Sequence, residues 1–252
     1  MNALRCSLLL SFALLLLAPA CAPTRPNLVV ASDLANPPFA QFDDARGASG
    51  RDVEMMTELA RRLGRELVWE RMDFPALLPA VESGEVDAVC ATLGITEERA
   101  RRVRFTRPYF ETAIAVVVRN GPDEPQSLAD LAGRPVAAGS GTTSAFAVEA
   151  GLPDAIGVFE NKSGATTPDR LLNGEVDAAV MDGPNADQIV AESAGQLRRL
   201  EEDLDAERYG LVVSLDNGEL GDALDQALED LEREGFLLQL DVKYGLRGAE
   251  SP

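Results

Sequence analysis

The sequence predicts an α/β protein of two doubly wound lobes joined by two hinge strands. Three observations predict this architecture. Short apolar runs alternate with helix-like runs in the first half, the alternation begins again after the loop GPDEPQ at 121–126, and the chain then leads into two C-terminal helices. Such alternation is typical of a mainly parallel sheet with helices on its faces, so a restart implies a second sheet. A chain that returns to its first lobe crosses between the lobes twice, which implies a hinge.

Five elements of the first lobe follow residue 27. Strands are predicted where short β-branched runs end at turn residues, and helices where apolar residues recur at helical spacing. In the first helix, Val53, Met56, Leu59 and Leu63 share one face, and Gly64 ends the pattern. The segments, in the order strand, helix, strand, helix, strand, are NLVVASD (27–33), DVEMMTELARRLG (52–64), ELVWERM (66–72), FPALLPAVESG (74–84) and VDAVCATL (86–93).

The second lobe begins after a connecting strand, YFETAIAVVVRN (109–120). A helix, a turn and a strand are predicted in SLADLAGRPVAAGSG (127–141). The elements that follow are the helix TTSAFAVEAG (142–151), the strand AIGVFE (155–160), the helix PDRLLNG (168–174) and the strand VDAAVMDG (176–183). A second connecting strand is predicted in YGLVVSLDN (209–217), before helices at 218–235 and 236–245.

The pentapeptide GEVDA occurs at 84–88 and again at 174–178. Each copy follows a helix that carries a Leu-Leu pair and precedes a short apolar strand. The repeat indicates two similar lobes. The predicted division of the chain is a signal peptide (1–20), a lipid-anchor tether (21–26), the first part of lobe 1 (27–112), lobe 2 (113–208), and a return to lobe 1 with the C-terminal helices (209–252).

The N-terminal residues predict export to the periplasm or cell surface. Arg5 precedes the apolar stretch LLLSFALLLLA, and the small-residue site APA ends directly before Cys21, as in a signal peptide. A cysteine at the cleavage point, followed by the loose tether APTRPN, favours lipidation of Cys21, and plain secretion is the alternative. If Cys21 is acylated, Cys90 has no disulfide partner, and its apolar strand predicts that it packs as a small hydrophobic residue.

Composition excludes several function classes. The formal net charge of −19 disfavours nucleic acid and electrostatic binding to anionic lipid. The chain contains no histidine, which excludes histidine-dependent triads and proton relays. The acidic run EEDLDAE at 201–207 lacks the spacing of a calcium loop and is interpreted as a solvated face. We expect no metal, no cofactor and no catalytic residue.

Candidate ligand-binding residues follow the apolar strands, because the crevice of an open α/β sheet lies beyond the carboxyl ends of its strands. They are Asp33, Phe74, Thr92 with Gly94, Gly141 to Thr143, and Asp182. Arg99 joins them, because Thr96 is expected to cap the helix EERARRV and a cation in the first turn opposes the helix dipole unless it holds an anion. Thr142 and Thr143 would cap the next helix. The alternatives are a surface arginine at Arg99, a turn former at Asp182 and a core side chain at Phe74.

From LVVASD to LDVKYG the chain resembles the extracytoplasmic solute-binding proteins of ABC transporters, family 3, which capture polar amino acids. The resemblance is carried, in family order, by ALLPAVESGEVDAVCATLGITEERARRVRFTRPYF, LAGRPVAAGSGTTS, LLNGEVDAAVMDGP and YGLVVSLDNGEL. It implies the type II periplasmic binding protein fold, in which two α/β lobes close around the ligand. It further implies a monomer that delivers a polar amino acid or related small zwitterion to a permease.

The resemblance also implies residue roles. Arg99 would clamp the ligand α-carboxylate with Thr143 and the backbone near Gly94, and Asp182 would hold the α-ammonium. The remaining candidates lie nearby in the family pattern: Asp33 toward the distal group, Phe74 as one side-chain wall, Asn36 at the place of the other, the carbonyl of Ala91 and Thr92 near the ammonium, and Thr142 beside Thr143. Each GEVDA would then lead into a strand that delivers one lobe's share of the site.

Three positions depart from the family pattern. Asn36 stands where an aromatic wall is common, Gly94 replaces a frequent serine, and Arg51 replaces an aromatic in GRDVE. These changes leave side-chain specificity open. Two other functions stay open: a sensing module for a membrane receptor and a dehydratase-like enzyme on the same scaffold, although Asn185 stands where such an enzyme would want an acid near Asp182. We expect a binding protein rather than an enzyme.

Overall fold

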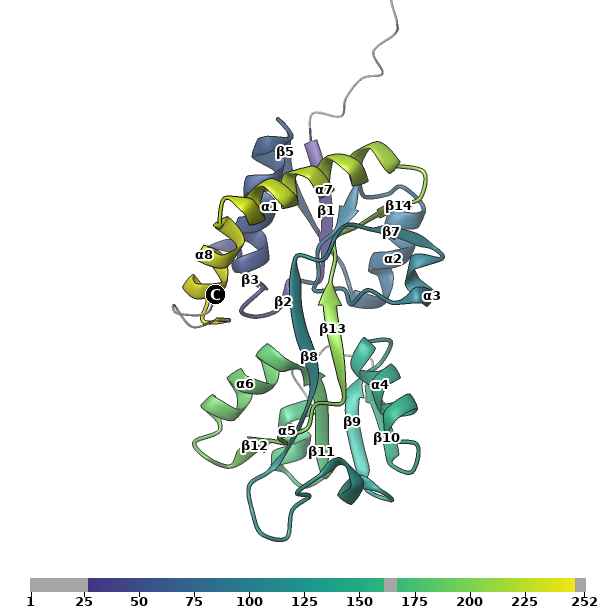
Figure 1. The fold of residues 1–252 in the computed structure, drawn as a ribbon, viewed down its shortest axis with the longest axis vertical. Helices are drawn as coiled ribbons and strands as arrows, with labels where there is room; N and C mark the ends of the chain where they lie inside the picture. The colour runs from purple at the N-terminus through teal and green to yellow at the C-terminus, as the bar shows by residue number, and fades with distance from the viewer. Residues whose placement is uncertain (1–26, 161–166, 248–252) are drawn as a thin grey trace, which may run out of the picture.

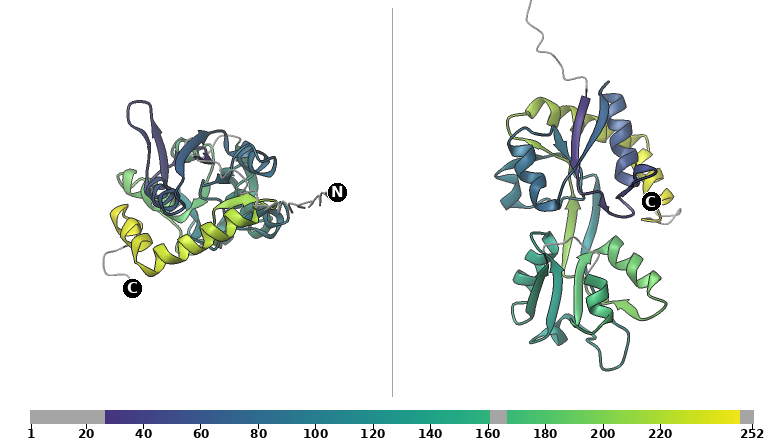
Figure 2. Two further views of the ribbon diagram at one scale, coloured as in Figure 1. Left: turned by 90° about the horizontal axis from the view of Figure 1, so that it is seen from above. Right: turned by 180° about the vertical axis from the view of Figure 1, so that it is seen from behind.

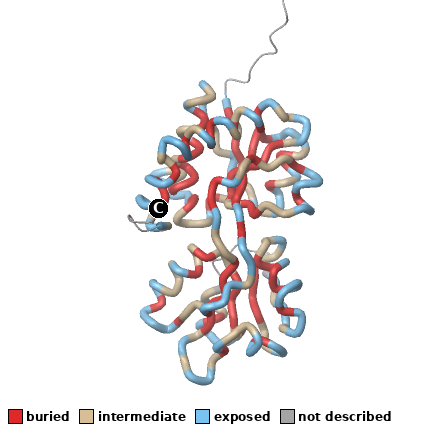
Figure 3. Tube along the Cα trace, in the orientation of Figure 1, coloured by how far each residue is buried: buried red, intermediate tan, exposed pale blue. Residues whose placement is uncertain are grey.

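The computed structural model describes residues 27–160 and 167–247 and shows two lobes connected by two strands (Figure 1). The predicted signal peptide, Cys21 and the tether lie outside the described residues. Buried residues run through the middle of each lobe (Figure 3). No helix in the described ranges is long and apolar enough to cross a membrane.

Lobe 1 is built on a five-stranded sheet in the order β5-β1-β6-β14-β7. Strand β1 pairs in parallel with β5 and β6, whereas β14 is antiparallel to β6 and β7. The strands are β1 (Asn27–Ser32), β5 (Glu66–Arg71), β6 (Ala88–Val89), β7 (Val103–Phe105) and β14 (Val212–Ser214). A small three-stranded sheet of β2 (Ala35–Asn36), β3 (Ala40–Asp43) and β4 (Gly47–Ser49) is attached to it.

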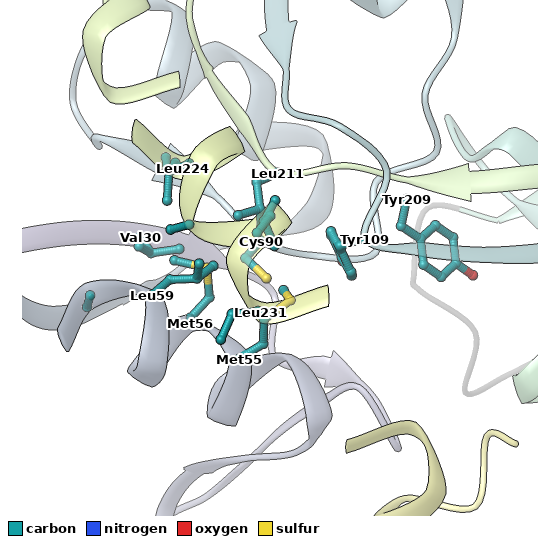
Figure 4. Close-up of a cluster of buried hydrophobic side chains, with 14 of the residues drawn as sticks. Val30, Met55, Met56, Leu59, Cys90, Tyr109, Tyr209, Leu211, Leu224 and Leu231 are labelled. Carbon is teal, nitrogen blue, oxygen red and sulfur yellow. The ribbon is translucent and has the colours of Figure 1, made fainter. Parts of the chain in front are cut away.

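Helices cover both faces of this sheet. They are α1 (Arg51–Arg62), α2 (Phe74–Glu82), α3 (Glu97–Ala100), α7 (Gly218–Arg233) and α8 (Phe236–Lys243). Successive side chains of a strand point to opposite faces, so Val30 packs with α1 and α7, whereas Ala31 packs with α2. Figure 4 shows the first of these layers, in which Cys90 lies among aliphatic and aromatic side chains. Cys90 is fully buried and free, as a small core residue.

Arg51 is fully buried in lobe 1, on the first turn of α1. Its Nε donates to Asp241 Oδ1 at 2.9 Å, its Nη1 to Asp52 Oδ1 at 3.0 Å, and its Nη2 to the carbonyl oxygen of Tyr109 at 3.2 Å. A buried cation is tolerated when it is paired and hydrogen-bonded. The charge of Arg51 is therefore balanced by two carboxylates, Asp52 and Asp241. The network links α1, α8 and the residue before the connecting strand.

Lobe 2 is built on a sheet in the order β10-β9-β11-β8-β12, with β13 paired to β8. Strand β9 is parallel to β10 and β11, and β8 is antiparallel to β11, β12 and β13. The strands are β8 (Phe110–Arg119), β9 (Pro135–Gly139), β10 (Ile156–Glu160), β11 (Ala178–Asp182), β12 (Leu197–Arg199) and β13 (Asp205–Tyr209). The helices are η1 (Leu128–Leu131), α4 (Thr143–Gly151), α5 (Thr167–Leu172) and α6 (Gly183–Glu192).

The two connecting strands are β8 and β13, which run side by side between the lobes (Figures 1 and 2). The prediction that YGLVVSLDN forms the second connecting strand was wrong in its bounds. The connecting strand β13 ends at Tyr209, and 212–214 form a strand in the sheet of lobe 1. The interpretation of 201–207 as a solvated face was also wrong for its last residue. Glu207 is buried and, with Tyr209, lies on the inward face of β13, while Arg208 between them is exposed.

The two GEVDA copies have the same local structure. Gly84 and Gly174 follow α2 and α5 with φ of 74° and 73°, the left-handed conformation in which glycine ends helices. The aspartates then pair with arginines just before the strand: Asp87 with Arg65 and Asp177 with Arg119. In both lobes, therefore, the repeat ends a helix and turns the chain into a central strand.

Candidate functional site

The site lies where the two lobes meet, beyond the ends of the central strands. Asp33 follows β1, Thr92 follows β6, Thr143 follows β9, and Asp182 ends β11. Side chains of the two lobes make direct hydrogen bonds here, so residues predicted from separate strands are assembled across one interface.

Arg99 is the cation of the site. Its side chain is buried, so the alternative of a surface arginine is wrong. Thr96 caps α3 as predicted, accepting from the backbone N–H of Arg99 at 3.2 Å. The guanidinium donates from Nη1 to the carbonyl oxygen of Gly94 at 2.8 Å and from Nη2 to that of Gly141 at 3.0 Å. Burial lowers the pKa of Arg99, while the negative charges of Glu207, Glu98 and Asp182 raise it in part. Arg99 thus joins lobe 1 to lobe 2 through its own side chain.

Glu207 is a carboxyl group inside this interface. Its Oε1 accepts a hydrogen bond from the hydroxyl of Thr143, the first residue of α4. A Cβ atom at position 94 would lie 2.5 Å from Glu207 Oε1 and 2.6 Å from Thr143 Cγ2. Glycine therefore stands at 94 because the contact between Glu207 and Thr143 fills the space that a side chain would need.

Asp182 lies beside Glu207, on β11 of the same lobe 2 sheet, in which β8 pairs with both β11 and β13. Burial raises the pKa of Asp182, and the nearby Tyr209, Glu207 and Asn36 groups and the charge of Arg99 lower it in part. None of these groups makes a hydrogen bond of standard geometry to the Asp182 carboxylate. Burial first, and then the negative charge of Asp182, raise the pKa of Glu207 to about 9. Two neighbouring carboxyl groups in a buried site oppose each other's ionisation, so the pair favours holding a proton.

Asn36 connects the lobes through its side chain. Its side-chain amide donates to Thr92 Oγ1 at 2.7 Å, and its Oδ1 accepts from Asn185 Nδ2 at 2.6 Å. Asn185, on α6, also donates to the carbonyl oxygen of Pro37 at 3.1 Å. The chain Thr92, Asn36, Asn185 therefore runs from lobe 1 to lobe 2.

Two residues at the ends of the lobe 1 strands adopt left-handed backbone conformations. Leu34, directly after Asp33, has φ of 48°, and Thr92 has φ of 46°. Residues other than glycine rarely adopt such conformations, and those that do cluster at binding and catalytic sites. Both lie at the mouth of the interlobe interface.

Other predicted site residues have structural partners. Burial raises the pKa of Asp33, while hydrogen bonds from the backbone N–H groups of Ala35 and of Asp33 itself and the charge of Arg71 lower it in part. These backbone hydrogen bonds agree with a strand-end cap. Phe74 begins α2 and packs, partly buried, against the lobe 1 core. Thr142 caps α4 by accepting from Ala145 N at 3.2 Å. Thr143 does not cap the helix, contrary to expectation, because its hydroxyl faces Glu207.

Glu207 and Tyr209 were not among the predicted site residues. Asn185 entered only as the position where a dehydratase-like enzyme would want an acid. A signal for the first two existed, because period-2 alternation in DAERY places them on one face of a strand. Asn185 had no such signal, since its contact depends on how the lobes meet. Among the described residues, no cluster of three or more acidic or cysteine side chains could hold a metal ion.

A surface hollow of about 450 Å³ lies elsewhere, between the connecting strand and α7. Its arginine, Arg107, is paired with Glu229 and Glu232. Most of the charged residues that line the hollow are acidic, and it lies apart from the interlobe residues.

Comparison with known proteins identifies relatives over nearly the whole described chain. The family model of bacterial extracellular solute-binding proteins, family 3, matches residues 28–247. The L-arginine-binding protein of Pseudomonas aeruginosa is 27% identical over 234 residues, which covers 90% of each chain. An ancestral arginine-binding protein, solved with bound arginine, superposes with a TM-score of 0.80 at 32% identity and covers 87% of this chain and 98% of its own. The ancestral amino acid-binding protein AncCDT-1, a precursor of cyclohexadienyl dehydratase, has a TM-score of 0.79 at 26% identity and covers 87% of this chain and 95% of its own.

Proposed function

Because the chain belongs to the family of bacterial extracellular solute-binding proteins, family 3, we propose that it captures a polar amino acid or a related small zwitterion between its lobes. The captured ligand is then delivered to the permease of an ABC transporter. One observation carries the proposal: a buried arginine of lobe 1 and a carboxylate at the end of a lobe 2 strand face the same interlobe space.

Arg99 is suited to the ligand carboxylate. A guanidinium has five N–H donors and matches a carboxylate as a bidentate fork. Its bonds to the described residues, at Gly94 and Gly141, use one N–H on each of two nitrogens. The N-terminus of α4, at Thr143, adds backbone amides that favour an anion at the same place. A ligand carboxylate held by these groups would contact both lobes.

Asp182 is suited to the ligand ammonium. Its carboxylate ends β11, where burial raises its pKa and the side chains of Tyr209, Glu207 and Asn36 lower it in part. A cation beside it would offset the cost of burying the negative charge. Because Arg99 and Asp182 lie on different lobes, only a closed arrangement lets one small zwitterion contact both, and ligand binding therefore favours closure.

The function is exerted outside the cytoplasm, as the family description states for its members. We propose in addition that Cys21 anchors the mature protein to the membrane through a lipid, on the strength of the segment LAPAC and the tether that follows.

A thermal-shift screen of the purified protein tests the function. The panel contains the proteinogenic amino acids, other small zwitterions and dicarboxylates. A ligand at a hundred times its Kd should stabilise the folded protein by about 2.7 kcal/mol, which raises Tm by several degrees. A shift with amino acids that is lost in Arg99→Ala supports the proposal. Shifts only with compounds that lack either a carboxylate or an ammonium group would contradict it.

A further inference from the structure

Two polar atoms in the interlobe interface are buried without a hydrogen-bond partner among the described residues. They are Oε2 of Glu207 and the hydroxyl of Tyr209. Glu207 is 5% exposed and Tyr209 is fully buried. An unpartnered buried polar atom costs about 1–3 kcal/mol, and native proteins contain few of them. Two such atoms on one strand, beside the carboxyl group of Asp182, call for a functional explanation.

The Tyr209 hydroxyl and the carboxyl groups of Glu207 and Asp182 lie near one another. Tyr209 ends the hydrophobic layer of lobe 1, and Figure 4 shows its hydroxyl directed away from that layer. Its ring is held by Phe39 and Phe110, with centroids 5.6 Å and 5.8 Å away. The charges of Asp182 and Glu207 contribute, after burial, to raising the pKa of the Tyr209 hydroxyl, so all three oxygen groups lie close together.

The position of Glu207 is specified by its neighbours rather than left over from packing. One oxygen accepts the Thr143 hydroxyl, and Gly94 leaves the room for it that any other residue would fill. The second oxygen has no hydrogen-bond partner among the described residues, and Asp182 and Tyr209 lie near this carboxyl group. Two carboxylates and one hydroxyl are too few oxygens for Ca²⁺, which takes six to eight, whereas they match the three N–H donors of a primary ammonium.

We propose that Glu207 is a specificity-determining residue that forms, with Asp182 and Tyr209, a three-oxygen subsite for a primary ammonium group of the ligand. The inference rests on the proposed function and deepens it. With one guanidinium and two carboxylates facing the ligand, the site favours ligands of net positive charge over acidic ones. It also excludes ligands whose amino group is acylated, because an amide nitrogen has neither the charge nor the three donors.

The ionisation of the acid pair supports this subsite. The groups that face Glu207 are Asp182, Arg99 and the hydroxyl of Thr143. Burial and the negative charge of Asp182 raise the pKa of Glu207 to about 9, although the Thr143 hydroxyl and the charge of Arg99 lower it in part. An arriving ammonium favours the charged carboxylate and lowers that pKa. Binding near pH 7.5 should therefore release a proton from the acid pair into solution.

Isothermal titration with three probes tests the subsite: L-arginine, L-argininamide, which lacks the carboxylate, and 5-guanidinopentanoate, which lacks the α-ammonium. The variants are Glu207→Gln and Tyr209→Phe, with Glu111→Gln as the control because it makes the same change at an exposed position of the adjacent connecting strand. Glu207→Gln should weaken both ammonium probes at least about tenfold and 5-guanidinopentanoate less than about twofold. The wild-type protein, titrated at pH 7.5 in phosphate and in Tris, should release protons on binding L-arginine, and Glu207→Gln should not.

Tyr209→Phe provides a second test of the subsite in case Glu207→Gln fails to fold. Removal of an unpartnered hydroxyl should leave Tm unchanged or raised, yet weaken the ammonium probes at least about threefold, the loss of one hydrogen bond to a charged group. The proposal is overturned if either folded variant binds L-arginine as tightly as the wild type, or if all three probes weaken equally. L-argininamide binding without L-arginine binding would refute the proposed function and leave the subsite standing. If the wild type binds L-arginine and Glu207→Gln binds it equally well, the subsite is refuted and the proposed function stands. No binding of any probe to the wild type at tens of millimolar would refute the subsite.

Discussion

Asn185 of lobe 2 donates its side-chain amide to Asn36 of lobe 1 at 2.6 Å and to the carbonyl oxygen of Pro37 at 3.1 Å. These contacts join the two lobes directly through side chains. We call the contact of Asn185 with Asn36 and Pro37 the latch. Because it joins the two lobes, it bears on lobe closure as well as on the shape of the site.

The latch predicts that Asn185→Ala destabilises the closed state. Two hydrogen bonds, each contributing about 0.5–1.5 kcal/mol, should be lost, and the Kd for the ligand should rise by roughly five- to a hundredfold, mainly through faster dissociation. Stopped-flow and equilibrium titration measure this. Asn120→Ala is the control, because its side chain makes one hydrogen bond, to Gly195, within lobe 2. Equal dissociation rates for Asn185→Ala and the wild type would rule out a latch.

Arg99→Ala should weaken the binding of carboxylate ligands by about 2–5 kcal/mol, because it removes a charge-assisted pair in a closed interface. Isothermal titration checks the loss. Arg101→Ala is the matched control, since Arg101 lies two residues away with a side chain 78% exposed and makes only a 4.0 Å contact to Glu97. Unchanged affinity in Arg99→Ala would show that another group holds the carboxylate.

The raised pKa of Glu207 predicts a dependence of folding stability on pH. A carboxyl whose pKa is about 9 in the folded protein binds more protons there than in the unfolded chain between pH 4.5 and 9. The free energy of unfolding should therefore fall as pH rises through this window, by at most about 1.4 kcal/mol per pH unit from this group. Urea unfolding of the wild type and of Glu207→Gln at pH 5, 7 and 9 measures the difference. The variant should gain stability relative to the wild type as pH rises, and a constant difference would mean that Glu207 is already ionised at pH 5.

The buried cluster around Arg51 predicts an expensive substitution far from the interface. Asp241→Ala leaves the fully buried guanidinium without one of its two carboxylates and should lower the free energy of unfolding by about 3–5 kcal/mol. Urea unfolding tests this against Asp230→Ala, whose exposed pair with Arg233 should contribute no more than about 1 kcal/mol. Equal losses in the two variants would mean that the buried network contributes no more than a surface pair.

Lipidation predicts that Cys21→Ser releases the mature protein from the membrane. The substitution removes the thiol that an acyl group would need and leaves the export signal in place. Fractionation of expressing cells, with the wild type beside the variant, measures the distribution. Retention of the variant in the membrane fraction would refute the anchor.

Much of the fold follows from local pattern. Helical spacing in α1 and α7, the glycines that end α2 and α5, and the cap at Thr96 are all decided by residues within a few positions of one another, and they are found where the sequence predicts them. The placement of Arg99 near the interface was predictable for the same reason, because a helix N-terminus and a strand end are local features.

The sequence by itself therefore determined the α/β class, the two-lobed architecture, the order of the elements and the family, since each rests on local periodicity or on motifs in sequence order. Only the tertiary structure decided that Glu207 enters the site, that Gly94 makes room for it, and that Asn185 meets Asn36. These contacts join residues far apart in the sequence: Thr143 and Glu207 are separated by 64 positions, and Asn185 and Asn36 by 149 positions. Their existence depends on the angle at which two packed lobes meet, and no local propensity encodes that angle.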